Sequence, residues 1–296
     1  MRVSLVHNPD AGDGRTTKAE LVAALRAAGH DVRYHRSSAR GVAAALRERP
    51  DAIVVAGGDG TVGRVALARA DRSVPIAVLA LGTANNVAWA LGVAERPWRE
   101  TIDGLAAARV RTVDVGHMRT PGGTREFLES AGVGLVAELL RDAERRVGPA
   151  DTDAIDAGRA RVLDVLDRAV PRWHTIDADG ADLSGEYLMV EALTLPAVGP
   201  RLVLAPDARA DDGLLHLVCV GAGERDALRA YVQALREGAP VTPLRARAVR
   251  VVRLSVRGAE SHVDDERWPA ADESDDEPLH ATIAAADGAP VRFLVP

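Results

Sequence analysis

Residues 57–61 read Gly57-Gly58-Asp59-Gly60-Thr61, directly behind the apolar run Asp51-Ala52-Ile53-Val54-Val55-Ala56. A buried strand that breaks into three glycines is poor folding material, because glycine loses more backbone entropy on folding than any other residue. What such a loop provides is a chain that can place its backbone amides against an anion at a helix N-terminus. The stretch therefore predicts a strand, a phosphate-binding loop and a helix. The alternative is a tight strand-to-helix turn with Thr61 as the N-cap.

A second apolar run, 76–81, ends with the same chemistry, in Gly82-Thr83-Ala84-Asn85-Asn86. Thr83 and the loop amides are candidates for holding phosphate, and the two asparagines for binding ribose or a base. Asn86 would also serve as the N-cap of a helix over 87–91, and that reading stays open. Two strand ends of this kind predict one phosphate-binding site.

The remaining polar groups near these loops suggest a nucleotide with a cation. Asp59 cannot bind phosphate directly because like charges repel, so it must act through a divalent cation or on hydroxyls of the nucleotide. The N-terminal loop Asn8-Pro9-Asp10-Ala11-Gly12 is a third candidate, in which Asn8 could reach a nucleobase or a phosphate. The chain's single lysine, Lys18, is followed by Ala19, so a Walker-type phosphate loop is absent.

The order of apolar and polar segments predicts two domains. Over residues 1–114 short apolar strands alternate with helices, which is typical of a parallel, doubly wound α/β sheet with ligands at the carboxyl ends of its strands. Over residues 115–296 strands dominate, apart from a helical stretch at 136–170, and this predicts a β-rich, antiparallel, sandwich-like domain. Strands are expected there at 187–193, 201–204, 214–220, 249–256, 281–284 and 291–295.

Composition and charge narrow the class of protein. The chain has 296 residues and a net charge of −6, which argues against nucleic acid as a partner. The single cysteine, Cys219, lies in an apolar run and is expected in the core, and one cysteine suits a reducing cytoplasm. No apolar stretch is long enough to cross a bilayer, so we expect no transmembrane segment.

Three motifs together resemble a known family. Asn8-Pro9-x-Ala11-Gly12, Gly57-Gly58-Asp59-Gly60-Thr61 and Leu81-Gly82-Thr83-Ala84-Asn85-Asn86 are similar, in order and spacing, to those of the bacterial diacylglycerol-kinase-like lipid kinases. That family shares a superfamily with sphingosine kinases and, more distantly, NAD kinases. Ala205-Pro206-Asp207-Ala208 followed by Asp211-Asp212-Gly213 extends the resemblance into the second half, so that it covers essentially the whole chain.

The resemblance implies further site residues. The family's late Asp-Gly-Glu segment matches Asp264-Asp265-Glu266, which makes Asp264 the candidate general base and Glu266 its support or that of the metal. Asp212 resembles the family's structural magnesium ligand, with Asp211 as a second candidate and a plain turn as the alternative. The chain departs from the family at Asn86, where a carboxylate is usual, and at Asp265, where glycine is usual. It also departs at Gly63-Arg64, where the family usually carries a glutamate.

The implied function is ATP-dependent phosphorylation of a lipid hydroxyl with Mg²⁺, diacylglycerol or a related lipid being the acceptor. The enzyme would be cytoplasmic and would visit the membrane surface peripherally, with Arg245, Arg247, Arg250, Arg253 and Arg257 either contacting anionic lipid or forming a solvated face. A kinase of a soluble substrate, as NAD kinases are, and a nucleotide-binding regulator without catalysis remain the alternatives. The oligomeric state is open, with a homodimer as one option.

Overall fold

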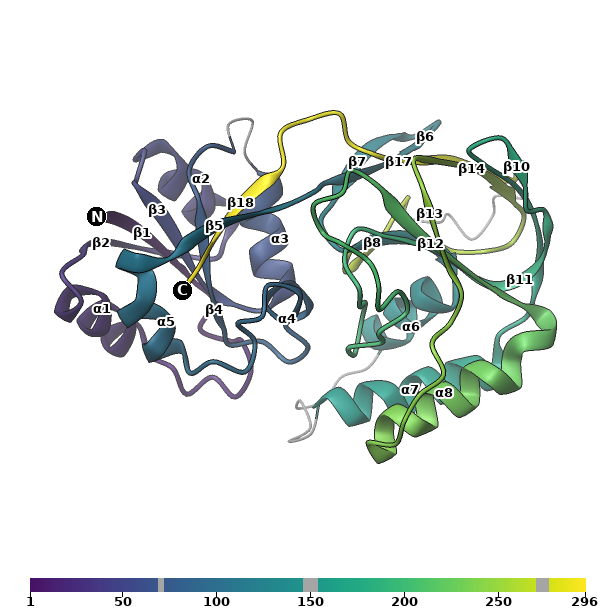
Figure 1. The fold of residues 1–296 in the computed structure, drawn as a ribbon, viewed down its shortest axis with the longest axis horizontal. Helices are drawn as coiled ribbons and strands as arrows, with labels where there is room; N and C mark the ends of the chain where they lie inside the picture. The colour runs from purple at the N-terminus through teal and green to yellow at the C-terminus, as the bar shows by residue number, and fades with distance from the viewer. Residues whose placement is uncertain (69–71, 146–153, 270–276) are drawn as a thin grey trace. The chain divides into compact units, whose positions relative to one another are not determined.

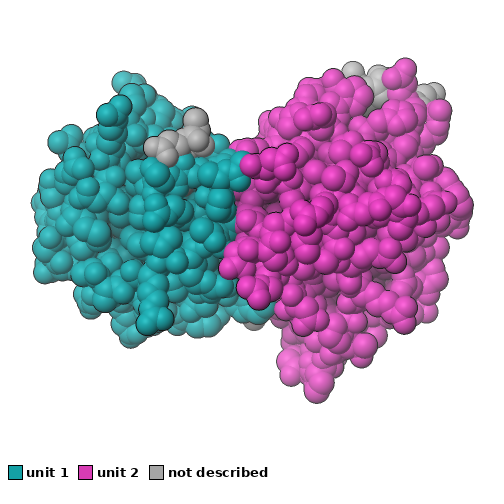
Figure 2. All heavy atoms as spheres, turned by 45° about the horizontal axis from the view of Figure 1, so that its top comes forward, with its two compact units in different colours: residues 1–113, 288–296 teal, residues 114–287 magenta. Residues whose placement is uncertain are grey.

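The computed structural model describes residues 1–68, 72–145, 154–269 and 277–296. The chain divides into two compact units, Met1–Val113 with Gly288–Pro296 (unit 1) and Asp114–Asp287 (unit 2), coloured separately in Figure 2. Within the described ranges no helix is long and apolar enough to cross a membrane.

Unit 1 is an α/β layer structure (Figure 1). Its strands are β1 (Arg2–His7), β2 (Asp31–Arg36), β3 (Ala52–Gly57), β4 (Ile76–Ala80), β5 (Arg109–Val113) and β18 (Val291–Val295), in the order β2-β1-β3-β4-β18-β5. Its helices are α1 (Lys18–Ala27), α2 (Ala39–Arg47), α3 (Asp59–Leu67), α4 (Asn86–Ala90) and α5 (Trp98–Gly104), with a 3-10 turn η1 (Leu105–Ala107). All neighbouring strands are parallel except the β18–β5 pair. The predicted parallel α/β sheet is confirmed.

The core of unit 1 explains why strands and helices alternate. Val54 and Ala56 of β3 pack on one face of the sheet with Leu21 and Leu25 of α1 and with Ile102 of α5. On α2, Ala45 accepts a hydrogen bond through its carbonyl oxygen from the Ser4 hydroxyl of β1. Every residue of β3 is buried, as a central strand covered on both faces requires.

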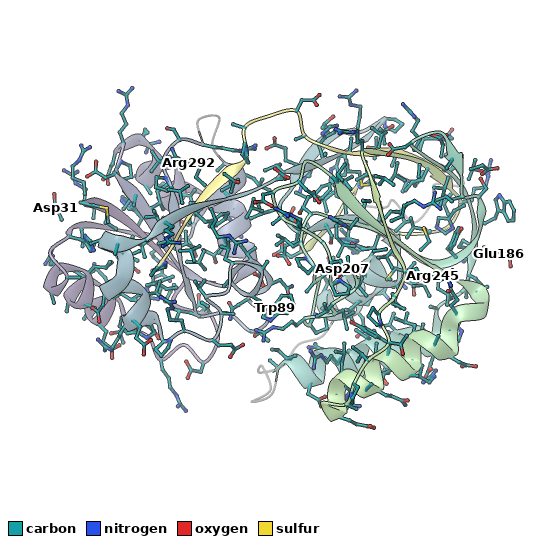
Figure 3. All side chains as sticks on the ribbon, in the orientation of Figure 1. Asp31, Trp89, Glu186, Asp207, Arg245 and Arg292 are labelled. Atoms are coloured by element: carbon teal, nitrogen blue, oxygen red, sulfur yellow. The ribbon has the colours of Figure 1, made fainter. Side chains whose placement is uncertain are left out.

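The end of the chain differs from the expected domain division. We predicted that residues 115–296 form the second domain, but residues 288–296 belong to unit 1. Strand β18 pairs with β4 and β5, and its Val291 and Phe293 are fully buried. Arg292, labelled in Figure 3, donates a hydrogen bond of 2.9 Å to the carbonyl oxygen of Ser73. The apolar alternation of β18 revealed a strand, but not which sheet the strand joins.

Unit 2 is a curled antiparallel sheet with helices packed against it (Figure 1). Its earlier strands are β6 (Gly116–Thr120), β7 (Gly123–Phe127), β8 (Ser130–Gly134), β9 (Arg172–Ala178), β10 (Ala181–Asp182) and β11 (Gly185–Leu193). Its later strands are β12 (Leu215–Gly221), β13 (Ala246–Val249), β14 (Val251–Val256), β15 (Ser261–Val263), β16 (Glu266–Arg267) and β17 (Leu279–Ala285). The helices are α6 (Leu135–Glu144), α7 (Ala154–Arg168) and α8 (Arg225–Glu237), with a 3-10 turn η2 (Ala222–Glu224).

The β-rich antiparallel class predicted for the second half is confirmed, with two local differences. The strands belong to one hydrogen-bonded sheet instead of two separate sheets. Its main path is β16-β15-β8-β11-β9-β14-β17-β6-β7, and β10, β12 and β13 pair outside this path. The predicted strand at 201–204 is wrong: Leu202 makes only an isolated bridge to Val198, and the segment packs as a loop in the core between helices and sheet. The expected helical stretch 136–170 contains α6 and α7, with residues 146–153 outside the described part.

Candidate functional site

In unit 1 the loops after β1, β3 and β4 meet at the carboxyl edge of the sheet. The amide of Asn8 donates to the carbonyl oxygen of Ala56 at 2.9 Å, and the amide of Leu81 donates to that of Gly57 at 3.1 Å. Parallel strands end at the same edge, so the three motifs that lie far apart in the sequence become neighbours. The structure therefore brings the three nucleotide-binding candidates of the sequence together.

The glycines of these loops are needed for close packing of backbone on backbone. A Cβ built on Gly82 would lie 2.3 Å from Cα of Gly58, and one on Gly58 would lie 3.0 Å from Cα of Gly82. A Cβ on Gly12, whose φ is +61°, would lie 2.3 Å from the carbonyl oxygen of Leu81. The glycines thus let the three loops touch one another, a role that local residue patterns do not predict.

Helix α3 begins earlier than expected, at Asp59, with Gly58 as the N-cap. Asp59, Gly60 and Thr61 therefore form its first turn, and the alternative in which Thr61 is the N-cap is wrong. The Thr61 side chain is buried against Gly57, where a Cβ would lie 2.9 Å from the threonine Oγ1. At the second position of the helix, the amide of Gly60 has no acceptor within the helix, which leaves the positive end of α3 at this edge.

Asp59 links the first motif to the second. Its Oδ1 accepts a hydrogen bond of 3.0 Å from the backbone amide of Val87 in the first turn of α4. The reading of Asn86 as the N-cap is wrong, because α4 begins at Asn86 itself and its N-cap is Asn85, in a left-handed conformation with φ of 51°. The Asp59 carboxylate of α3 therefore caps a backbone amide in the first turn of α4, and no local sequence pattern predicts such a contact.

The Asn85 carboxamide closes its own loop. Its Oδ1 accepts from the amide of Gly82 at 3.0 Å, and its Nδ2 donates to the carbonyl oxygen of Gly82 at 2.6 Å. The contact shown for Asn85 is therefore one that shapes the loop. Its predicted contact with ribose or a base stays a prediction, and so do the nucleotide contacts predicted for Asn8, Pro9 and Thr83.

A cavity of about 500 Å³ lies beside the N-terminal loop. It is lined by His7, Pro9, Gly14, Thr16, Thr17, Lys18, Tyr34 and Arg36. Lys18 Nζ lies 4.5 Å from the centre of the Tyr34 ring, and His7 contacts the Tyr34 hydroxyl through Nδ1 at 3.3 Å. The two cations beside Pro9, Lys18 and Arg36, suit an anionic ligand. Tyr34 and Arg36 are not among the site residues predicted from the sequence.

In unit 2 the candidate base Asp264 occupies the tight turn between β15 and β16. Its carboxylate accepts hydrogen bonds from the backbone amides of Leu128, Glu129 and Ser130, the shortest being 2.8 Å, to Glu129. Burial raises the pKa of Asp264 to about 6, although the three amides lower it. The left-handed residue of this turn is Asp264, with φ of 49°, and not Asp265, which stands where the family usually carries glycine.

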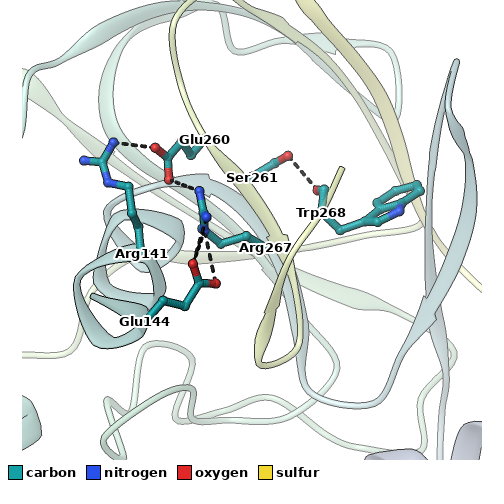
Figure 4. Close-up of polar contacts among 6 residues, drawn as sticks. All are labelled: Arg141, Glu144, Glu260, Ser261, Arg267 and Trp268. Carbon is teal, nitrogen blue, oxygen red and sulfur yellow. Dashed lines mark hydrogen bonds and ion pairs between the residues drawn. The ribbon is translucent and has the colours of Figure 1, made fainter. Parts of the chain in front are cut away.

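Ion pairs hold the hairpin that carries Asp264 and Glu266. Arg267 of β16 pairs with Glu144 of α6 at 2.8 Å and with Glu260 at 3.3 Å, and Arg141 of α6 pairs with Glu260 (Figure 4). The Ser261 hydroxyl donates to the carbonyl oxygen of Trp268 at 2.7 Å across the hairpin (Figure 4). Glu266 itself is exposed and pairs with Arg125 of β7.

The metal candidates Asp211 and Asp212 lie in one turn, which Asp114 contacts from a distant position in the chain. Asp114 is not among the site residues predicted from the sequence. Asp114 Oδ2 accepts from the amide of Gly213 at 2.7 Å, and Asp212 Oδ1 accepts from that of Leu214 at 3.0 Å. Burial raises the pKa of Asp114, and the charges of Asp212 and Asp211 raise it further. Among the residues that the structure describes, no group of three or more His, Cys, Asp or Glu is arranged to hold a metal ion.

The arginines of the predicted lipid contact do not share one strand. Arg247 lies on β13, which pairs with β12, whereas Arg253 lies on β14 between β9 and β17. Arg253 pairs with Asp177 of β9 at 3.2 Å. Arg250 lies between them, where the chain leaves β13 for β14.

The comparisons with known proteins cover both units. Residues 2–118 match the "Diacylglycerol kinase catalytic domain", and residues 158–287 match the "YegS C-terminal NAD kinase beta sandwich-like domain". A diacylglycerol kinase of Bacillus subtilis is 28% identical over 246 residues, 79% of either chain. A "Probable lipid kinase YegS-like" of Pseudomonas aeruginosa is 30% identical over 267 residues, which are 86% of this chain and 83% of the relative. A crystal structure of a diacylglycerol kinase from Bacillus anthracis superposes with a TM-score of 0.70 at 18% identity, covering 100% of this chain and 97% of that one, and this shows a shared fold.

Proposed function

Because this chain belongs to the diacylglycerol kinase catalytic-domain family of lipid kinases, we propose that it transfers the γ-phosphoryl group of ATP to a lipid hydroxyl. Diacylglycerol or a related lipid is the proposed acceptor. The observation that carries the proposal is the assembly of the loops 8–12, 57–61 and 82–86 at one sheet edge, with Gly58 against Gly82.

In this proposal unit 1 holds the nucleotide. The amides at the start of α3 and in the loop 82–86 face the phosphates, since a helix N-terminus favours negative charge. Lys18, which lies over the Tyr34 ring, and Arg36 add positive charge beside Pro9.

The transfer needs a group that accepts a proton, and Asp264 is our candidate. Its carboxylate takes the proton of the lipid hydroxyl while the hydroxyl oxygen forms a bond to the γ-phosphorus. The bond from that phosphorus to the β–γ bridging oxygen breaks, and ADP leaves. A pKa of about 6 leaves Asp264 charged at neutral pH and close enough to neutrality to accept a proton.

The donor set fits a magnesium ion that arrives with the nucleotide. Mg²⁺ is commonly held by one or two carboxylates together with substrate phosphates and water, and Asp59 offers one carboxylate at the phosphate loops. When bound, the ion would neutralise charge on the phosphates. Asp211 and Asp212 stay candidates for a separate structural ion.

The lipid acceptor requires contact with a membrane surface, so we propose a cytoplasmic enzyme that binds membranes peripherally. An arginine near an anionic lipid surface contributes about 1 kcal/mol to the free energy of membrane binding. Arg245, Arg247 and Arg257 are the first residues to examine.

The deciding experiment is transfer of label from [γ-³²P]ATP with Mg²⁺ to lipids in mixed micelles. Diacylglycerol, sphingoid bases and phosphatidylglycerol are tested side by side, with NAD as the soluble acceptor. Label in a lipid supports the proposal, and label in NAD alone would contradict it. Nucleotide binding without label in any acceptor would favour a regulatory protein.

A further inference from the structure

A buried acid and a buried histidine face each other across strand β8. Glu191 of β11 and His262 of β15 are both in register with Gly132 of β8, so the three residues form one row across three strands. Both side chains are 0% exposed. A Cβ on Gly132 would lie 2.3 Å from Glu191 Oε2 and 2.5 Å from the carbonyl oxygen of Val190. Glycine at position 132 is therefore what lets the glutamate reach the histidine.

Both imidazole nitrogens of His262 face acceptors. Nε2 lies 3.1 Å from Oε2 and 3.0 Å from Oε1 of Glu191, and Nδ1 lies 3.0 Å from the carbonyl oxygen of Asp264. A carbonyl oxygen can only accept, so Nδ1 carries a proton, and a second proton must lie between Nε2 and the carboxylate. Burial alone lowers the pKa of His262, but the charge of Glu191 and its hydrogen bond raise the pKa above the ordinary value.

The row of Glu191, Gly132 and His262 therefore ends at the backbone of Asp264, the candidate base. Asp264 has a left-handed backbone, which is strained for a residue with a side chain and persists only where the surroundings hold it. Its amide donates to the carbonyl oxygen of Ser130 at 2.8 Å, and its own carbonyl is held by His262. The same turn aims its carboxylate at the amides of residues 128–130.

A buried ion pair contributes little to the stability of a fold, because the cost of desolvating both charges offsets most of their attraction. We propose that His262 is a positioning residue for Asp264: Glu191 holds the imidazole at Nε2, and the Nδ1 donor fixes the turn that aims the Asp264 carboxylate. This inference rests on the proposed role of Asp264 as the general base.

Two substitutions separate the two nitrogens of His262. Asn can place an amide N–H near the site of Nδ1, and Gln can place one near the site of Nε2. His262→Asn retains a donor for the Asp264 carbonyl, whereas His262→Gln retains a donor for Glu191 and loses the first. His174→Gln is the matched control: His174 is also buried, and its Nδ1 also contacts a carbonyl oxygen, that of Arg172, at 2.8 Å.

We expect His262→Gln to lower kcat by up to about 100-fold, because misplacing a reacting group by about 1 Å has that effect. KM for ATP should change less than about twofold, and His262→Asn should retain at least about ten times the kcat of His262→Gln. In an Asp264→Asn background the two variants should have the same residual rate, because residues that act through one group are not additive.

Equal kcat for His262→Gln and His262→Asn would overturn the inference. It would also be overturned if His262→Gln lowered kcat by the same factor in the Asp264→Asn background as in the wild type. Melting temperatures report folding, and if a variant unfolds because Glu191 has lost its partner, both substitutions are compared in a Glu191→Gln background. Turnover by the wild-type protein tests the proposed function separately: a wild type that phosphorylates lipid, with equal Gln and Asn variants, refutes only the positioning role.

Discussion

The contact between Gly58 and Gly82 makes a measurable prediction about the nucleotide site. In Gly82→Ala the new Cβ would start 2.3 Å from Cα of Gly58 and 2.8 Å from Oδ1 of Asn85. Ordinary van der Waals contact begins near 3.4 Å, so the two loops must separate by about 1 Å, and both neighbours belong to the loops themselves. A displacement of about 1 Å at a phosphate-positioning loop costs roughly 100-fold in turnover, or about 2.7 kcal/mol of transition-state stabilisation.

The assay is steady-state kinase activity with ATP varied, together with calorimetric titration of ATP and Mg²⁺. Gly58→Ala should lose less than Gly82→Ala, because its Cβ starts 3.0 Å from the nearest atom. Gly223→Ala is the control, since a Cβ there meets nothing within 4 Å. If Gly82→Ala kept wild-type turnover and ATP affinity, or lost less than Gly58→Ala, the reasoning that these loops form the nucleotide site by close packing would be refuted.

Three further predictions concern other parts of the chain. Asp59→Asn keeps an oxygen that accepts from the Val87 amide, so we expect a normal melting temperature but a loss of Mg²⁺-dependent activity. Asp59→Ala should also destabilise the fold by about 1 kcal/mol. Equal activity of Asp59→Asn and wild type would exclude a metal role for Asp59. Because burial raises the pKa of Asp264 to about 6, the base is protonated below that pH, and a kcat–pH profile should fall there and not near pH 4. Phe293→Ala should lower the free energy of unfolding by about 3–5 kcal/mol in urea titrations, because Phe293 is buried. The control, Trp173→Ala at an exposed position, should lower it by about 0.5 kcal/mol or less. Similar losses for the two variants would show that β18 is not part of the core.

Much of unit 1 could be predicted because its signals are local. A fully buried strand such as β3 reads as an unbroken apolar run, and the glycines behind it mark the loop. The partner of β18 could not be predicted, because an edge or central strand in another sheet has the same local pattern. For the same reason the apolar pattern of 201–204 predicts a strand, although its buried side chains fill the core from a loop.

The candidate site could be predicted in part from the sequence for a similar reason. The motifs around Gly58 and Gly82 carry unusual residue types at short spacing, so each was found separately. Contacts such as Asp59 with Val87 or Asp264 with the amides of 128–130 join residues far apart in the chain, and no spacing rule reports them.

By itself, the sequence determined the class of each half of the chain, the three glycine-rich loops and the family that those loops resemble. Those features depend on apolar periodicity and on glycine, whose effects act over a few residues. Only the tertiary structure decided that Gly58 lies against Gly82, that the last strand returns to the first sheet, and that Glu191 reaches His262 over Gly132. These depend on which backbones pack together across the fold, and such contacts are set by the packing of whole sheets and helices.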